Sequence, residues 1–160
     1  MSDAAGRFSE AAAAAGLAPD VRRFPEGTRT AEDAARAIGC DAGQIVKSLV
    51  FVAGSEPVLA LTSGRNRVDP VKLAALCGAS DARKATADEV RTATGYAIGG
   101  TPPFGHPTGL RCFADTDLMG FDMVWAAAGT PESVFSIGPE ELLRVAGAQV
   151  APFTETRPAG

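Results

Sequence analysis

Two apolar runs joined by a short turn constrain the fold of this 160-residue chain more than any other feature. Residues 45–52 are Ile-Val-Lys-Ser-Leu-Val-Phe-Val, and residues 58–62 are Val-Leu-Ala-Leu-Thr. Short runs rich in β-branched and apolar residues are typical of strands that are buried on both faces. The intervening residues 54–57, Gly-Ser-Glu-Pro, predict a turn. We therefore expect an antiparallel hairpin at the centre of a sheet.

Glycine, proline and capping residues divide the rest of the chain into short elements. N-cap residues, prolines in first turns and terminal glycines predict helices at about 2–16, 31–38, 70–77, 87–95 and 139–147. Apolar runs predict further strands at about 21–24, 96–98, 110–114, 123–127, 133–137 and 149–153. Strands and helices do not alternate regularly, and no long linker interrupts them. The expected fold is therefore a single compact α+β domain over residues 1–160, with a mixed or barrel-like sheet surrounded by helices.

The charge balance limits the partners that the chain can bind. The formal net charge is −4, from 15 Lys and Arg and 19 Asp and Glu residues. Proteins that grip long stretches of nucleic-acid backbone usually carry the opposite balance. Any RNA contact is therefore expected to be small, local or shared with a partner. The charge and the lack of a basic helix also disfavour a DNA-binding regulator.

The cysteines and the single histidine do not form a metal-binding pattern. Cys40, Cys77 and Cys112 are odd in number and lack CxxC spacing, and His106 is alone. We therefore expect no metal and no other cofactor, the cysteines as small core residues, and His106 in solvent. Scattered cysteines and the lack of a signal peptide favour the reducing cytoplasm. The alanine run 11–15 is too short to span a membrane, so no membrane association is expected.

Lys47 is the one charged residue inside the first apolar run. In an extended strand its side chain shares a face with Ile45 and Leu49, whereas Val46 and Ser48 point the other way. Burying an ammonium group is costly unless it is paired or lies in a wet pocket, where its pKa falls. From the residues alone, a structural role at a sheet edge or beside a carboxylate is favoured, and a role in a binding or catalytic site stays open.

Two small-residue segments are further candidates for a site. Residues 99–106 are Gly-Gly-Thr-Pro-Pro-Phe-Gly-His. Glycines would let main-chain N–H groups approach a ligand, and prolines would stiffen the loop, so that it could form an oxyanion hole. Residues 126–131, Ala-Ala-Ala-Gly-Thr-Pro, could line a tight pocket. A plain connector and dense packing are the commoner uses of such segments. The chain has no GxSxG elbow and no P-loop.

In this order and spacing, the segments resemble the YbaK/EbsC family, the free-standing relatives of the editing insertion domain of bacterial prolyl-tRNA synthetase. The resemblance rests on the strand with Lys47, on a Gly-x-x-x-Pro loop at Gly99 and Pro103, and on residues 128–130. It implies the YbaK/prolyl-tRNA synthetase-associated domain fold. The resemblance spans about residues 24–153 and leaves 154–160 as a C-terminal tail.

The resemblance implies an aminoacyl-tRNA deacylase that acts in trans. Such a protein hydrolyses the ester between a wrong amino acid and the tRNA 3′ end, here alanine or cysteine on proline tRNA, with serine or threonine as further substrates. The implied mechanism is metal-free and substrate-assisted: the terminal ribose hydroxyl helps to activate water, or the thiol of a cysteine substrate attacks its own ester. An activated ester needs positioning and oxyanion stabilisation more than a strong nucleophile. The implied partners are the aminoacyl-tRNA 3′ end and prolyl-tRNA synthetase or another synthetase.

The same resemblance implies roles for individual residues. Lys47 would contact the phosphate or ribose of the terminal adenosine, or the ester region. Main-chain N–H groups around Gly99 and Gly100 would hold the aminoacyl carbonyl as the catalytic contribution of the loop. The implied substrate-binding residues are Phe24, Thr101, Pro103, Gly129, Thr130 and Ser133. Some relatives place a histidine near the position of Ser133, so the edited amino acid stays open.

A non-catalytic binding module is the alternative hypothesis. The same fold would then hold a nucleotide or a tRNA end, or dock on a synthetase, without hydrolysing an ester. A deacylation assay distinguishes the two, because only the enzyme turns over a mischarged proline tRNA.

Overall fold

The computed structural model of the chain describes residues 3–24, 30–107 and 109–156. Within these ranges the helices are α1 (Ala4–Ala14), α2 (Ala31–Ile38), α3 (Pro70–Cys77), α4 (Ala87–Thr94) and α5 (Pro139–Ala146), with short 3₁₀ helices η1 (Ala42–Gln44) and η2 (Thr116–Gly120). The strands are β1 (Val21–Arg23), β2 (Ile45–Ala53), β3 (Glu56–Ser63), β4 (Ala82–Lys84), β5 (Arg111–Asp115), β6 (Val124–Ala127), β7 (Ser133–Ile137) and β8 (Ala148–Ala151).

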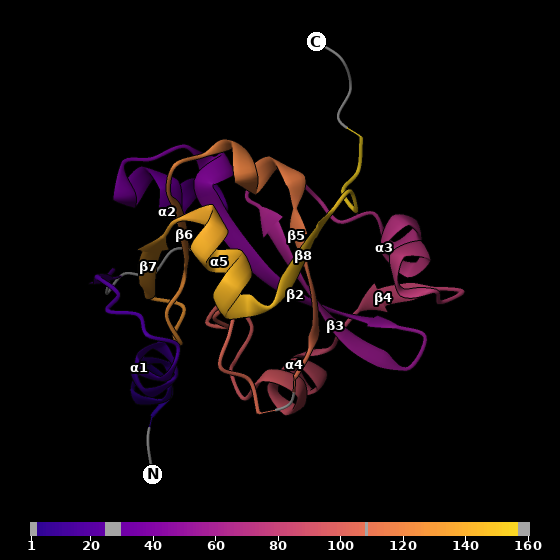
Figure 1. Cartoon of the computed structure of the whole chain (residues 1–160), viewed down its shortest axis with the longest axis horizontal. Helices are drawn as coiled ribbons and strands as arrows, with labels where there is room; N and C mark the ends of the chain where they lie inside the picture. Colours follow the sequence, from indigo (N-terminus) through magenta and orange to yellow (C-terminus); the bar gives the residue numbers. More distant parts are fainter. Residues whose placement is uncertain (1–2, 25–29, 108, 157–160) are drawn as a thin grey trace.

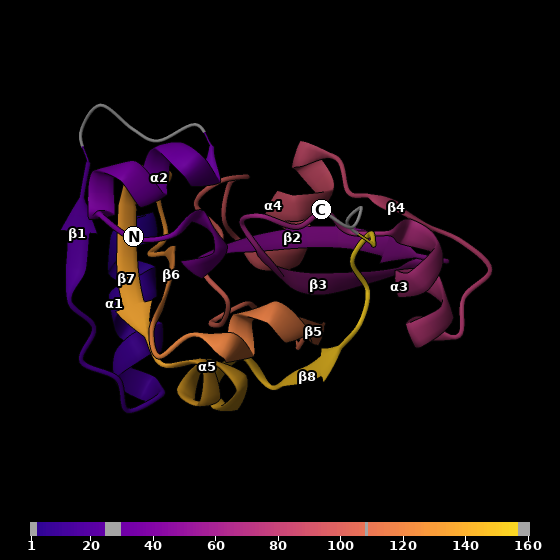
Figure 2. The ribbon, with the colours of Figure 1, turned by 90° about the horizontal axis from the view of Figure 1, so that it is seen from above.

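These strands form one mixed sheet, and the helices lie around it. Helices α1 and α2 lie at the end that holds β7, and α3 lies at the opposite end (Figure 1). The strand order is β1-β7-β6-β2-β3-β5-β8, with β4 also paired to β2. The sheet bends, so that β1, β7 and β6 run across the direction of β2 and β3 (Figure 2). The expected α+β fold with a mixed sheet surrounded by helices is confirmed.

The hairpin of β2 and β3 lies at the centre of this sheet, as the two apolar runs predict. The two strands pair antiparallel from Val46 opposite Ser63 to Ala53 opposite Glu56. Strand β6 is parallel to β2, and β5 is parallel to β3. The connection is tighter than expected, because residues 56 and 57 already belong to β3.

The helix boundaries follow the predicted caps. The side chains of Thr30, Asp69 and Thr86 each accept a hydrogen bond from a main-chain N–H in the first turn of the helix that follows. This satisfies donors that have no partner inside the helix. Gly78 ends α3 in the left-handed conformation, with φ of 68°. Glycine adopts this conformation without the strain that a side chain would add.

The prediction of a strand at residues 96–98 is wrong. The hydroxyl of Thr94 accepts a hydrogen bond from the N–H of Tyr96, and the N–H of Gly100 donates to the carbonyl of Ala97. The main chain is thus satisfied locally and forms a turn. Two other elements also differ from expectation: the short polar strand β4 carries no apolar run that could predict it, and β8 ends at residue 151 rather than 153.

Strand β2 separates two apolar clusters because its side chains alternate between faces. Val46 and Val50 pack into the larger cluster, which holds the rings of Phe8, Phe104 and Phe135. Phe51 and Ala53 pack on the other side, with Leu73 and Phe153. Ser48 therefore lies on the same face of β2 as the larger cluster, and Lys47 lies on the opposite face.

Both ends of the described chain form hydrogen bonds. Asp3 caps α1, and Ser2, where the first helix was expected to begin, lies outside the described residues. Thr154 forms a bridge with Val68, and the N–H of Glu155 donates to the carbonyl of Arg67. Residues 157–160 of the expected tail lie outside the described residues. In the part of the chain that is described, no helix has the length and apolar character to cross a membrane.

Candidate functional site

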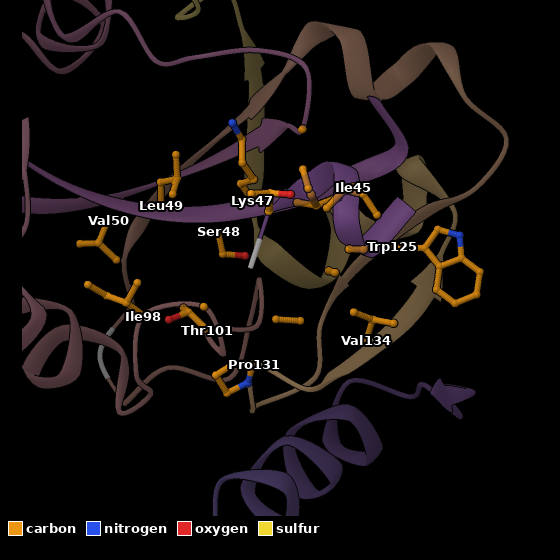
Figure 3. A pocket seen from close by; sticks show the side chains of 18 of the residues that line it. Ile45, Lys47, Ser48, Leu49, Val50, Ile98, Thr101, Trp125, Pro131 and Val134 are labelled. Atoms are coloured by element: carbon orange, nitrogen blue, oxygen red, sulfur yellow. The ribbon is translucent and has the colours of Figure 1, made fainter. Parts of the chain in front are cut away.

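A gap in the sheet opens beside β2. Strand β6 pairs with β2 only at Ile45 and Val46, and β4 pairs with it only from Phe51 to Ala53. Among the described residues, no strand pairs with 47–50 on that side. A cavity of about 910 Å³ lies in this region and is lined by residues from both faces of β2 (Figure 3). A ligand could therefore reach the edge of a central strand.

Lys47 lines this cavity on one face of β2 and points away from Ser48 (Figure 3). Its ammonium nitrogen donates a hydrogen bond of 2.6 Å to the main-chain carbonyl of Asn66. The acceptor is thus a main-chain carbonyl rather than a carboxylate. Burial lowers the pKa of the Lys47 ammonium, and the carboxylate of Glu32 acts in the opposite direction.

The Asn66 that holds Lys47 is itself fixed by two carboxylates, of which that of Asp115 is buried. Its side-chain amide donates to Asp115 at 2.8 Å and to Asp117 at 2.7 Å. The carboxylate of Asp115, only 2% exposed, also accepts from the N–H of Ser63 at 3.0 Å. Neither Asn66 nor Asp115 was predicted from the sequence. A carboxylate directly after the apolar run 112–114 was the one signal that could have drawn attention to it.

Three further cations line the same cavity as Lys47. They are Arg65, Arg67 and Lys84. The charges of Arg67 and Lys84 contribute to lowering the pKa of Lys47, because like charges disfavour its protonated form. Glu32 is the one carboxylate among the lining residues in the described part of the chain. The cavity is therefore locally positive in a chain whose net charge is −4, and it suits an anionic group.

The other face of β2 is neutral, and small residues form part of its lining. Ser48 points toward Thr101 and Pro131 across the cavity (Figure 3). Gly99 and Ala127 contribute to the same wall. In the described ranges, no histidine or cysteine lines the cavity, so it offers no nucleophile and base of the kind used by serine or cysteine hydrolases.

The structure brings four of the residues predicted for the site to this cavity. Lys47, Gly99, Thr101 and Ser133 line it. The lining does not include the other predicted residues: Phe24, Gly100, Pro103, Gly129 and Thr130. Four of them, Phe24, Gly100, Gly129 and Thr130, make packing contacts with neighbouring segments.

Close packing of two glycines joins the loop after α4 to the segment after β6. A Cβ atom on Gly100 would lie 2.9 Å from the carbonyl oxygen of Gly129 and 2.9 Å from the Cα of Thr130. Gly129 has φ of 104°, and a Cβ there would lie 2.7 Å from the carbonyl oxygen of Ala4 in α1. Phe24 packs on the other side, in the cluster that contains Trp125.

His106 and the cysteines lie away from the cavity lining. The expectation that His106 is in solvent is wrong: the ring is half-buried, and its Nε2 lies 2.9 Å from the carbonyl oxygen of Pro102. Burial lowers the pKa of His106. Cys112 is buried, as expected, and its burial raises the pKa of the thiol to about 12. Cys40 and Cys77 are only partly buried. No group of three or more potential metal ligands occurs in the described ranges.

Comparison with known proteins relates the chain to editing domains. The model of a family described as the aminoacyl-tRNA editing domain matches residues 25–145. A proline–tRNA ligase of Nitratidesulfovibrio vulgaris (strain DP4) is 40% identical over 99 residues, which are 62% of this chain and 17% of the ligase. The chain thus spans about a sixth of the length of such ligases. The uncharacterized protein YwhH of Bacillus subtilis (strain 168) is 34% identical over 124 residues, 77% of this chain and 78% of YwhH.

A solved structure is similar over nearly the whole chain. It is described as a candidate trans-editing enzyme for prolyl-tRNA synthetase. The two share 48% identity and a TM-score of 0.91, over 98% of this chain and 99% of the other.

Proposed function

The chain belongs to the aminoacyl-tRNA editing domain family, and on this premise we propose that it is a deacylase that acts in trans on mischarged tRNA. The bond cleaved is the ester between a wrong amino acid and the 3′-terminal adenosine. One observation carries the proposal: Lys47 with its neighbouring cations and the loop at Gly99–Thr101 line a single cavity, on opposite faces of β2. One face suits a phosphate, and the other, which carries no charged side chain among the described lining residues, suits the aminoacyl group.

Alanine or cysteine on proline tRNA is the proposed substrate. Relatives named as proline–tRNA ligases, and a structure described as a candidate trans-editing enzyme for prolyl-tRNA synthetase, support the choice of tRNA. Small residues on the Ser48 face, among them Gly99, Ala126 and Ala127, support the choice of a small amino acid. Serine and threonine remain further substrates to be tested.

The cations of the cavity are proposed to hold the 3′-terminal phosphates and ribose. Lys47, Arg67 and Lys84 supply charges over a short distance, whereas the whole chain is acidic. This distribution supports a small, local RNA contact rather than a long one. We expect weak binding of tRNA by the isolated protein and assistance from prolyl-tRNA synthetase or another synthetase.

Hydrolysis is proposed to depend on groups of the substrate itself. The ribose hydroxyl beside the ester, or the thiol of a cysteine substrate, takes the part of a protein base or nucleophile. The N–H groups of Gly99 and Thr101 are proposed to hold the aminoacyl carbonyl oxygen as negative charge develops on it. The N–H of Gly100 already donates to Ala97, so Gly100 contributes through packing.

A deacylation assay on proline tRNA charged with alanine, cysteine, serine, threonine or proline tests this function, with and without added prolyl-tRNA synthetase. We expect loss of alanine or cysteine well above the spontaneous rate and no loss of proline. If the protein binds the tRNA end and releases none of the four wrong amino acids, the non-catalytic module is correct instead. Equal release of all five would contradict an editing function.

A further inference from the structure

The hydroxyl of Ser48 is the one buried side-chain polar atom of the described residues that lacks a hydrogen-bond partner. A buried hydroxyl without a partner loses its bonds to water and gains nothing in return, so it destabilises the fold. Such groups are rare in native proteins and call for an explanation. Ser48 lies at the gap in the sheet, and its side chain points into the cavity (Figure 3).

The other hydroxyl groups on this side of the cavity are engaged within the protein. Thr101 donates to the carbonyl of Ala97 at 3.1 Å. Thr130 and Ser133 are hydrogen-bonded to each other at 2.8 Å. These residues can shape the wall, but among the described residues Ser48 is the one with a buried hydroxyl that has no partner in the protein.

The main chain of Ser48 offers a second oxygen at the same gap. Carbonyl groups two residues apart in a strand point to the same side. The carbonyl of Val50 accepts a hydrogen bond from the N–H of Ala85 on the gap side of β2. The carbonyl of Ser48 therefore also points to the gap, where no strand pairs with it. Ser48 thus has its hydroxyl on the neutral side of the cavity and its carbonyl oxygen at the gap beside it.

We propose that Ser48 binds the α-ammonium group of the aminoacyl substrate, with its hydroxyl and carbonyl oxygens as acceptors. This inference rests on the proposed deacylase function and assigns a residue to one part of its substrate. The charges favour this orientation, because Lys47, Arg67 and Lys84 attract phosphate and repel an ammonium group. The ammonium group is therefore directed to the opposite, neutral face, where it needs oxygen acceptors.

Binding of two non-hydrolysable ligands to the wild type and to Ser48→Ala tests the proposal. The ligands are 3′-amino-3′-deoxyadenosine acylated with alanine, which carries the ammonium group, or with propionate, which lacks it. Hydrogen bonds to a charged group are strong enough that their loss weakens binding about tenfold or more. We expect Ser48→Ala to lose about tenfold in affinity for the alanyl ligand and to bind the propionyl ligand like the wild type.

A stability measurement separates this role from a structural one. Because the Ser48 hydroxyl has no partner in the protein, Ser48→Ala should have an unchanged or higher melting temperature. The matched control is Ser63→Ala, which removes a buried hydroxyl that donates to the carbonyl of Gly43 at 2.7 Å. This control should melt at a lower temperature and keep the preference for the alanyl ligand.

Several results would overturn the assignment. It would be contradicted if Ser48→Ala lost affinity equally for both ligands or kept its affinity for both. A lower melting temperature of Ser48→Ala would also contradict it. Deacylation by the wild type, measured in parallel, keeps the two proposals distinct. If the wild type is active and Ser48→Ala binds both ligands as the wild type does, only the role of Ser48 is contradicted. If the wild type binds neither ligand and releases no amino acid, both the role of Ser48 and the deacylase function are contradicted.

Discussion

The position of the Lys47 ammonium depends on a buried carboxylate that does not line the cavity. Its acceptor is the carbonyl of Asn66, and the side chain of Asn66 is held by Asp115. Asp115 also anchors the end of β3 through the N–H of Ser63. Burying a charged carboxylate is costly unless hydrogen-bond donors compensate for the lost water. The lysine is therefore oriented by a buried hydrogen-bond network rather than by a direct ion pair.

Replacing Asp115 by asparagine tests this network. The amide presents a donor where the carboxylate accepts, so at least one buried bond is lost, and the free energy of unfolding should fall by about 1–3 kcal/mol. Deacylation should also slow, because the carbonyl that holds Lys47 is no longer fixed. Urea unfolding and single-turnover rates measure the two effects. Asp122→Asn, at an exposed position, is the control and should change neither; equal behaviour of the two variants would contradict the role of Asp115.

The loop from Gly99 to His106 is packed against the protein as an element. Phe104 is 5% exposed and contacts the rings of Phe8 and Phe135. Gly100 lies against Gly129 and Thr130. These contacts hold the main-chain donors beside the cavity.

A side chain at Gly100 should displace this loop. In Gly100→Ala the new Cβ would meet main-chain atoms at 2.9 Å, and such overpacking costs about 1–3 kcal/mol. Deacylation should fall together with the free energy of unfolding. Gly109→Ala is the matched control, because nothing lies within 4 Å of its Cβ position. If both variants unfold at the same urea concentration, the packing account of the loop is wrong.

The same loop should make stability depend on pH through His106. Burial lowers the pKa of this ring in the native state, whereas the unfolded chain takes up the proton near the ordinary pKa of 6.5. The free energy of unfolding should therefore fall as the pH drops below about 6.5. In His106→Gln, urea unfolding at several pH values should show a shallower decline. If the free energy of unfolding changed with pH by the same amount in the two proteins, His106 would have the same pKa in the folded and unfolded states, which contradicts this prediction.

At the scale of the whole molecule, positive charge is concentrated at one cavity of an acidic protein. This arrangement predicts a weak but measurable salt dependence of RNA binding. With three phosphate contacts to a single-stranded 3′ end, the logarithm of the affinity should fall with the logarithm of the salt concentration with a slope of about −2. Arg67→Ala should make the slope shallower, and Arg144→Ala on α5, outside the cavity lining, should not. Equal slopes for all three proteins would place the RNA elsewhere.

The sequence predicted most of the fold because its signals are local. Caps at Thr30, Asp69 and Thr86 and the apolar runs of β2 and β3 determine their elements through neighbouring residues. Strand β4 depends on pairing with β2, which no local pattern encodes. For the candidate site, the resemblance pointed to Lys47 and the Gly99 loop. Their common cavity, the Asn66 network and the unpartnered hydroxyl of Ser48 arise from contacts between distant segments, which only the folded chain brings together.

The central claim is tested most directly by the rate at which Lys47→Ala releases alanine from proline tRNA that has been mischarged with alanine. Lys72→Ala is the matched control, since the Lys72 ammonium also donates to a main-chain carbonyl, that of Thr154 at 2.9 Å, and lies outside the cavity lining. In single-turnover assays of folded proteins, we predict that Lys47→Ala loses at least tenfold in rate, as expected for a lost charge-assisted contact to substrate, and that Lys72→Ala retains the wild-type rate. A Lys47→Ala protein as fast as the wild type would contradict the assignment of this cavity as the editing site.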